Sequence, residues 1–189
     1  DAYEQAQGDD RSLRLRVEHA QIVAPADIPR FAALGVLPSM QPTHCTSDMP
    51  WATARVGPER IRGAYAWQRL RDAGVTHLPL GSDFPVESPN PMLGFYAAVT
   101  RLSPKGTSPS GPKGWFPDQR LTRMQTLRGF TIDAAYAAFQ EKDTGSIVAG
   151  KWADLAIFDR DLITCPTGAL LTAQVRYTIV AGEIAYTAK

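Results

Sequence analysis

Residues 13–44 read LRLRVEHAQIVAPADIPRFAALGVLPSMQPTH, and the predicted fold rests on the pattern within them. Alternating Leu and Arg predict a short strand that ends near His19. Residues 25–34 begin with Pro and stop before Gly, which predicts a helix. The apolar residues 36–40 predict a second strand, which runs into Gln-Pro-Thr and then His44. A strand, a helix and a strand in this order form the unit from which parallel sheets are built.

The same alternation continues downstream. After a loop at residues 45–56, residues 57–73 open with Gly-Pro and end before Gly, which predicts a helix. Residues 75–80 predict a third strand, followed by Gly-Ser and then Asp83. Residues 92–101 predict another helix. The expected fold class is therefore α/β with a parallel sheet.

The strand–helix alternation does not continue after residue 101. Residues 103–120 are rich in Pro, Gly and Ser, which fits either a surface connection or an active-site loop. Two helices are expected next, at 121–129 and 131–141, with Thr131 as the N-cap of the second. Short strands are then expected at residues 146–148, 153–158, 175–180 and 183–186. The last two are joined by Ala181-Gly182, a tight hairpin.

Composition excludes several classes of protein. The chain has 189 residues, with 20 Lys and Arg against 19 Asp and Glu, so it lacks the basic surplus of a nucleic-acid binder. Its apolar stretches are far shorter than the roughly 20 residues that a membrane span needs, and its first residues do not resemble a signal peptide. With two cysteines, no disulfide framework is expected, and the cytoplasm is the expected compartment.

Polar side chains follow each of the three predicted strands. His19, His44 and Asp83 stand where the carboxyl ends of parallel strands build active sites. Two imidazoles and a carboxylate suit Zn²⁺ or a similar ion. Each residue also has a simpler interpretation, namely packing for a histidine and capping a turn for Asp83. Cys45 has no partner cysteine that would make it a strong ligand candidate, and His77 is expected to be structural.

Other catalytic motifs are absent from the sequence. It contains no glycine-rich phosphate loop, no Gly-x-Ser-x-Gly elbow and no Cys-x-x-Cys pair. Trp51 and Trp115 fall in the two loops nearest the predicted ligands. They are candidates for lining a substrate pocket, and packing in the core or within the loops is the alternative.

Several segments together resemble the metal-dependent amidohydrolases, in particular the amidohydrolase 3 branch of YtcJ-like and N-substituted formamide deformylase-like proteins. The similarity covers nearly the whole chain and lies in RVEHAQ (16–21), LPSMQPTH (37–44), the spacing of Asp48 and Trp51, GPERIRGAYAWQRLRDAG (57–74), GSDFPVESPNP (81–91), TIDAAYAAF (131–139) and GSIVAGKWADLAIFDRDL (145–162). GSDFPVE combined with the Gly-Ser-Ile…Gly-Lys…Ala-Asp-Leu pattern is the most specific part.

The resemblance implies the C-terminal half of a TIM (β/α)₈ barrel at residues 1–141, followed at 142–189 by the C-terminal strands of a small composite β-sandwich. It implies that His19 and His44 are the metal ligands of the fifth and sixth strands. Asp83 matches the eighth-strand ligand that also handles the proton, and Asp48 joins the two tryptophans as a candidate for the substrate pocket. The cofactor is a divalent metal ion, expected to be zinc.

The chain also departs from the family pattern. It has no His-x-His pair, and its first lysine is Lys105, so the first-strand ligands and a bridging carbamylated Lys or carboxylate are expected upstream. A full barrel needs about 250 residues. We therefore expect the chain to carry only part of the active site, with the N-terminal barrel half as its partner, either as a preceding segment or as a separate chain.

The implied activity is hydrolysis of a non-peptide carbon–nitrogen bond in an amide or N-formyl-type small-molecule substrate, through water activated by the metal. Two alternatives stay open: a non-catalytic fragment of such an enzyme, and a related deaminase acting on a cyclic C=N bond. A homo-oligomer is a further expected form. Neither nucleic acid nor a membrane is an expected partner.

Overall fold

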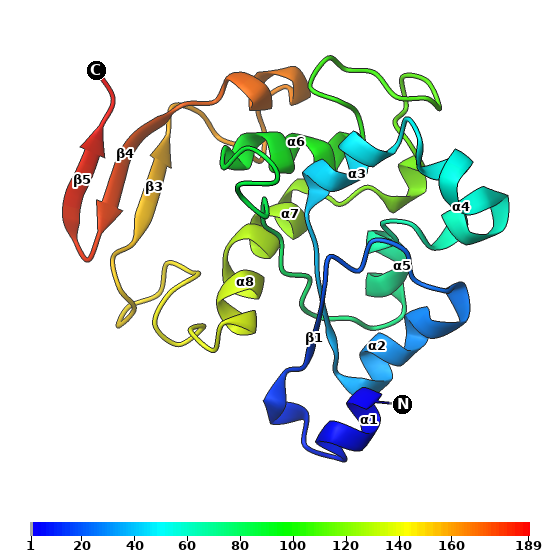
Figure 1. The fold of residues 1–189 in the computed structure, drawn as a ribbon. Helices are drawn as coiled ribbons and strands as arrows, with labels where there is room; N and C mark the ends of the chain where they lie inside the picture. Colours follow the sequence, from blue (N-terminus) through cyan, green and yellow to red (C-terminus); the bar gives the residue numbers. More distant parts are fainter. Residues whose placement is uncertain (1) are drawn as a thin grey trace.

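A computed structural model describes residues 2–189. Asp1, the first residue of the predicted barrel half at 1–141, lies outside the described residues. Helices surround two short parallel strands, and a separate three-stranded antiparallel sheet lies to one side (Figure 1). The α-helices are α1 (Ala2–Gln7), α2 (Ile28–Leu34), α3 (Pro42–Asp48), α4 (Ala52–Arg60), α5 (Trp67–Asp72), α6 (Pro91–Thr100), α7 (Arg123–Phe130) and α8 (Ile132–Ala137). Short 3₁₀ turns cover Arg11–Leu13, Pro25–Asp27, Ile61–Gly63, Pro117–Gln119 and Thr167–Thr172.

The first two predicted strands form and pair as expected. β1 (Arg16–Glu18) lies parallel to β2 (Leu37–Ser39), with Arg16 opposite Leu37. α2 connects them and ends at Gly35, whose φ of 65° lies in the left-handed region that glycine tolerates best. The predicted strand–helix–strand unit is confirmed.

The third predicted strand, residues 75–80, is reduced to one parallel bridge between Met40 and Leu80. Two features limit its pairing. The Leu78 N–H donates to the carboxylate of Asp133 at 3.2 Å, and Pro79 has no N–H to donate. The bridge still aligns this segment with β2, because the Met40 N–H donates to the Pro79 carbonyl at 2.9 Å.

The prediction of one helix over residues 57–73 and a loop over 45–56 is wrong. α3 and α4 occupy most of the expected loop, and the expected helix is interrupted between α4 and α5. Gly57 adopts φ 80° and ψ 169°, which is not helical, and Tyr65 adopts φ 48°. The chain therefore bends twice between Trp51 and Trp67, and the Tyr65 hydroxyl reaches Asp48 at the end of α3.

Most buried apolar side chains form one core between the parallel strands and the helices. Met40, Trp67 and Leu70 are completely buried there, and Arg101 is buried with them. The Arg101 guanidinium lies 4.5 Å from the Trp67 ring and donates to the carbonyls of Tyr65 and Trp115. Burial lowers the pKa of Arg101 from its ordinary value.

The C-terminal strands are β3 (Leu155–Phe158), β4 (Val175–Val180) and β5 (Glu183–Thr187), which form an antiparallel sheet in that order. The predicted hairpin at Ala181-Gly182 is confirmed, since both residues have a positive φ. The predicted strand at residues 146–148 is wrong. That segment turns instead, and Lys151 Nζ binds Ser146 Oγ at 2.7 Å across the turn.

Thr131 is the N-cap residue of α8, as predicted, but its side chain does not cap the helix. The Thr131 hydroxyl donates to the Leu127 carbonyl at 2.6 Å and makes no capping bond to α8. A capping box forms instead at the start of α7, between Thr122 and Gln125. Across residues 2–189, no helix is both long enough and apolar enough to cross a bilayer.

Candidate metal centre

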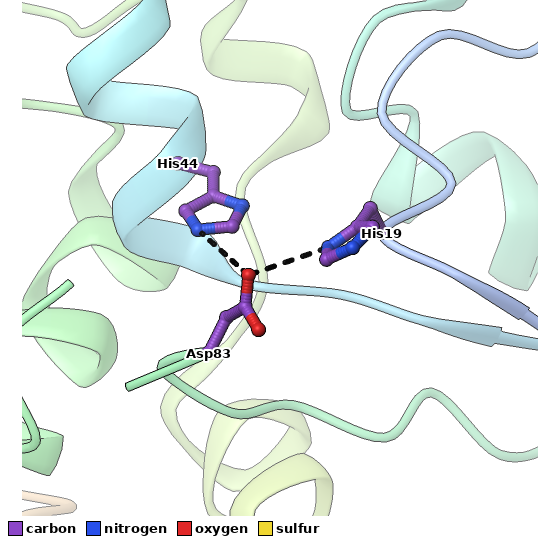
Figure 2. A group of neighbouring side chains, drawn as sticks. All are labelled: His19, His44 and Asp83. Atoms are coloured by element: carbon purple, nitrogen blue, oxygen red, sulfur yellow. Dashed lines mark ion pairs between the residues drawn. The ribbon is translucent and has the colours of Figure 1, made fainter. Parts of the chain in front are cut away.

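Three side chains from three segments converge at one end of the parallel strands. His19, His44 and Asp83 each offer a ligand atom, and these atoms all lie within 4.8 Å of one another. Figure 2 shows the Asp83 carboxylate between the two imidazoles. Its Oδ2 lies 3.9 Å from His19 Nδ1 and 3.8 Å from His44 Nε2. Metal–ligand bonds run about 2.0–2.2 Å, so an ion between these atoms is a reasonable fit.

The strand pairing explains why the three residues meet. His19 follows β1 directly, and Asp83 follows the bridge at Leu80. His44 stands in the first turn of α3, which begins at Pro42 two residues after Met40. Parallel strands bring their carboxyl ends to one edge, and the side chains that follow them share that edge.

Two of the three residues have an unusual backbone conformation. His19 has φ 67° and Asp83 has φ 57°, in the left-handed region that side-chain-bearing residues rarely adopt. Such conformations persist only where the surrounding structure enforces them, and they cluster at functional sites. This observation favours a functional role for His19 and Asp83 over ordinary packing.

His44 carries the most informative atom of the group. The residue is 8% exposed, and its Nε2 is buried without a hydrogen-bond partner among the described residues. A buried polar atom without a partner costs free energy. Nε2 is also the atom that faces Asp83 Oδ2. A cation between them would give Nε2 a partner, so the residues fit a divalent ion.

The donor set is two imidazoles and one carboxylate. His19 Nδ1 also lies 3.0 Å from Gln41 Oε1, an oxygen that only accepts, so while Nδ1–H donates there Nε2 is the ring nitrogen left to bind an ion. Cys45 adjoins His44 but is completely buried, which raises the pKa of its thiol to about 12, and its sulfur is not among the ligand atoms that converge here. His77 lies elsewhere, stacked on Tyr136 at 3.8 Å, as expected for a structural histidine.

The three pocket candidates lie in different surroundings. Asp48 Oδ2 accepts hydrogen bonds from the Tyr65 hydroxyl and from Gln21 Nε2. Trp51 is 49% exposed at the start of α4. Trp115 is 3% exposed and packs edge-on against Tyr65 at 6.1 Å. Trp51 is thus exposed and Asp48 half-buried, whereas Trp115 is buried against the Tyr65 ring.

Sequence reasoning missed Gln21, Gln41 and Tyr65. Burial, followed by the hydrogen bond to Asp48, raises the pKa of Tyr65, so its hydroxyl stays protonated and donates. Gln21 and Gln41 each stand within three residues of a predicted ligand, and that proximity was the available signal. Tyr65 is 17 residues from Asp48 and carried no such signal.

Comparison with known proteins gives a consistent result. The sequence model of the amidohydrolase family matches residues 1–186. The chain is 31% identical to N-substituted formamide deformylase of Arthrobacter pascens, over 98% of the chain and 33% of that protein. It is 30% identical to the putative amidohydrolase YtcJ of Bacillus subtilis, over 90% of the chain and 32% of that protein. The chain thus spans about a third of the length of these relatives.

Solved structures of metal-dependent hydrolases are also similar to this chain. An uncharacterized metal-dependent hydrolase from Pyrococcus horikoshii superposes with a TM-score of 0.70 at 32% identity, over 81% of this chain and 30% of that one. The zinc complex of the atrazine chlorohydrolase TrzN from Arthrobacter aurescens superposes with a TM-score of 0.61 at 22% identity, over 94% of this chain and 37% of that one. The second likeness concerns the fold alone.

Proposed function

Because the chain belongs to the amidohydrolase family, we propose that it supplies part of the active site of a metal-dependent hydrolase. The reaction is cleavage of a non-peptide carbon–nitrogen bond in an amide or N-formyl-type small molecule. The observation that carries the proposal is the convergence of His19, His44 and Asp83, with the buried Nε2 of His44 facing the Asp83 carboxylate.

His19, His44 and Asp83 would hold the divalent ion, for which zinc is the proposed identity because imidazole and carboxylate ligands suit it. The chemistry that such an ion supplies is Lewis acidity, which lowers the pKa of water at the site and polarises a carbonyl group. The two histidines would bind the ion as neutral imidazoles. β1, which directly precedes His19, and α3, which contains His44, set the positions of the two rings.

Asp83 is the proposed general base and acid. Within residues 2–189 neither of its carboxylate oxygens accepts a hydrogen bond, and its side chain is 37% exposed. An accessible carboxylate of this kind is free to take a proton from attacking water at one oxygen and return it to the leaving nitrogen. Asp48 and Trp51 are proposed to border the substrate. Trp115 is proposed to hold the Tyr65 ring in place by packing against it.

The upstream barrel half is the proposed partner, as a preceding segment or as a separate chain. The chain covers about a third of these curated relatives and 30% of the Pyrococcus hydrolase, so a barrel of their kind needs a further segment. Residues 1–141 are proposed to be its C-terminal half. Residues 142–189 would then supply strands of a small sandwich. The upstream half would contribute the remaining metal ligands.

The test uses the full-length protein that combines this chain with the upstream half. Metal content is measured first, and a panel of N-substituted formamides, simple amides and cyclic C=N compounds is then assayed before and after chelation. We expect a bound divalent ion and hydrolysis of an amide or formamide that chelation abolishes and zinc restores. Absence of bound metal, or turnover that chelation leaves unchanged, contradicts the proposal, and turnover of the cyclic compounds alone reassigns the substrate.

A further inference from the structure

Three side chains from the segments around His19, His44 and Tyr65 bind one another. The Tyr65 hydroxyl donates to Asp48 Oδ2, and Gln21 Nε2 lies 3.2 Å from the same oxygen and 2.9 Å from the Tyr65 hydroxyl. We call this group the Gln21–Asp48–Tyr65 triad. Each member contacts the other two, so the triad is a closed set of hydrogen bonds between three separate segments.

Two of these segments carry the metal ligands. Gln21 is two residues beyond His19. Asp48 is four residues beyond His44 in α3, and residues four apart lie on the same face of a helix. Since Gln21 contacts Asp48 directly, the triad joins the segment that bears His19 to the helix face that bears His44.

The backbone strengthens this connection. The Tyr65 N–H donates to the Gln21 carbonyl at 2.7 Å, and Ile22 pairs with Ala64 in an antiparallel bridge. Arg101, which is completely buried, donates to the Tyr65 carbonyl at 3.0 Å from the other side. Tyr65 is therefore fixed at its backbone as well as at its hydroxyl.

The segment before Gln21 needs such support. His19 and Ala20 have φ values of 67° and 38°, two consecutive residues in a region that side-chain-bearing residues disfavour. Without contacts beyond them, these residues would relax toward ordinary backbone angles, and the His19 ring would move away from Asp83. Gln21 provides the first strong contacts after the strained pair.

We propose that the Gln21–Asp48–Tyr65 triad is a positioning device that sets the distance between His19 and His44 and thereby the affinity of the centre for its metal ion. The inference rests on the proposed function, since it concerns the same metal site. The three residues act through the histidines. Residues that hydrogen-bond directly to a metal ligand typically change metal affinity by about 10–100-fold when they are removed. The triad acts on the segments that carry the histidines, one step further away, so the lower end of that range is expected.

The experiment measures zinc affinity by competition with a chromophoric chelator, in the full-length protein with Tyr65→Phe. Tyr96→Phe is the control, because it also removes the hydroxyl of a largely buried tyrosine but lies in the separate cluster of Met92, Phe95 and Leu170. We expect Tyr65→Phe to weaken zinc binding by about 10-fold, the lower end of the range for residues bonded directly to a ligand, and Tyr96→Phe to leave it unchanged. Excess zinc should restore hydrolysis in Tyr65→Phe, because the ligands and Asp83 remain.

Asp48→Asn is a second variant, which keeps an oxygen acceptor and guards against a folding failure of Tyr65→Phe. Its expected loss of zinc affinity is smaller, and combining the two changes should cost less than the sum of their separate effects. Wild-type zinc affinity in folded Tyr65→Phe or Asp48→Asn, or an equal loss in Tyr96→Phe, overturns the inference alone. A wild-type protein that binds no zinc overturns the proposed function and the inference together.

Discussion

Replacing Gly63 by alanine is a direct perturbation of the contact between the His19 segment and the Tyr65 segment. Gly63 lies at the end of the turn Ile61–Gly63, where its carbonyl accepts the Val23 N–H at 3.0 Å. A Cβ atom at position 63 would lie 1.6 Å from the Val23 carbonyl oxygen. Side-chain Cβ atoms essentially never approach closer than 3.0 Å, so the two backbones must separate by about 1.4 Å.

The cost follows from the bonds between these two segments. The Val23–Gly63 bond and the Tyr65–Gln21 bond measure 3.0 Å and 2.7 Å, and a displacement of this size takes both beyond hydrogen-bonding distance. Each such bond contributes roughly 0.5–1.5 kcal/mol, so Gly63→Ala should lower the free energy of unfolding by about 2 kcal/mol. The same displacement moves Gln21 away from Asp48, and zinc affinity should fall as well.

The assay is chemical denaturation of the full-length protein, followed by the zinc competition described above. Gly168→Ala is the control, since a Cβ there meets no atom within 4 Å. We expect wild-type stability and zinc affinity in the control. A Gly63→Ala protein within about 0.5 kcal/mol of wild type, the usual range of a neutral surface change, would show that this contact is not as close as described.

Further predictions concern catalysis, acid stability and association. Asp83→Asn should keep the fold but lower kcat at least about 100-fold, because an amide takes no proton near neutral pH; near-wild-type turnover of the metal-loaded variant would remove Asp83 from the mechanism. The hydrogen bond from Arg14 lowers the pKa of Glu141 to about 2, so the stability that this pair contributes is complete above about pH 4.5 and is lost as the pH falls toward 2. Melting temperatures measured from pH 5 to 2 should therefore fall less steeply in Glu141→Gln, and parallel curves would contradict this. Residues 1–189 expressed alone should associate, because β1 pairs only with β2 among the described residues and Ile184 and Tyr186 are exposed on β5; a compact monomer in analytical ultracentrifugation would count against it.

Local patterns were sufficient for the strand–helix–strand unit before the site, but not for α3, which holds His44 and begins where a strand end and a loop were expected. The alternation before His19 and the Gly35 stop predicted β1 and α2, because both depend on residues close in sequence. The convergence of His19, His44 and Asp83 followed from the rule that parallel strands bring their carboxyl ends to one edge.

Features that depend on distant residues were not predictable in this way. The third strand is cut short partly because Asp133, 55 residues away, takes the Leu78 N–H. The break at Gly57 depends on a positive φ that glycine permits but does not require. The contact of Tyr65 with Asp48 likewise depends on the folded path of the chain, and no periodicity signals it.

The position of the metal ion itself is the decisive observation. Crystals of the full-length protein, grown with zinc and measured above the zinc absorption edge, give an anomalous difference map that locates the ion without any assumption about which residues bind it. We predict a peak about 2.0–2.2 Å from His44 Nε2, from one ring nitrogen of His19 and from an oxygen of Asp83. A zinc peak bound elsewhere, with His44 Nε2 still unpartnered, would contradict the assignment of these residues to one metal centre.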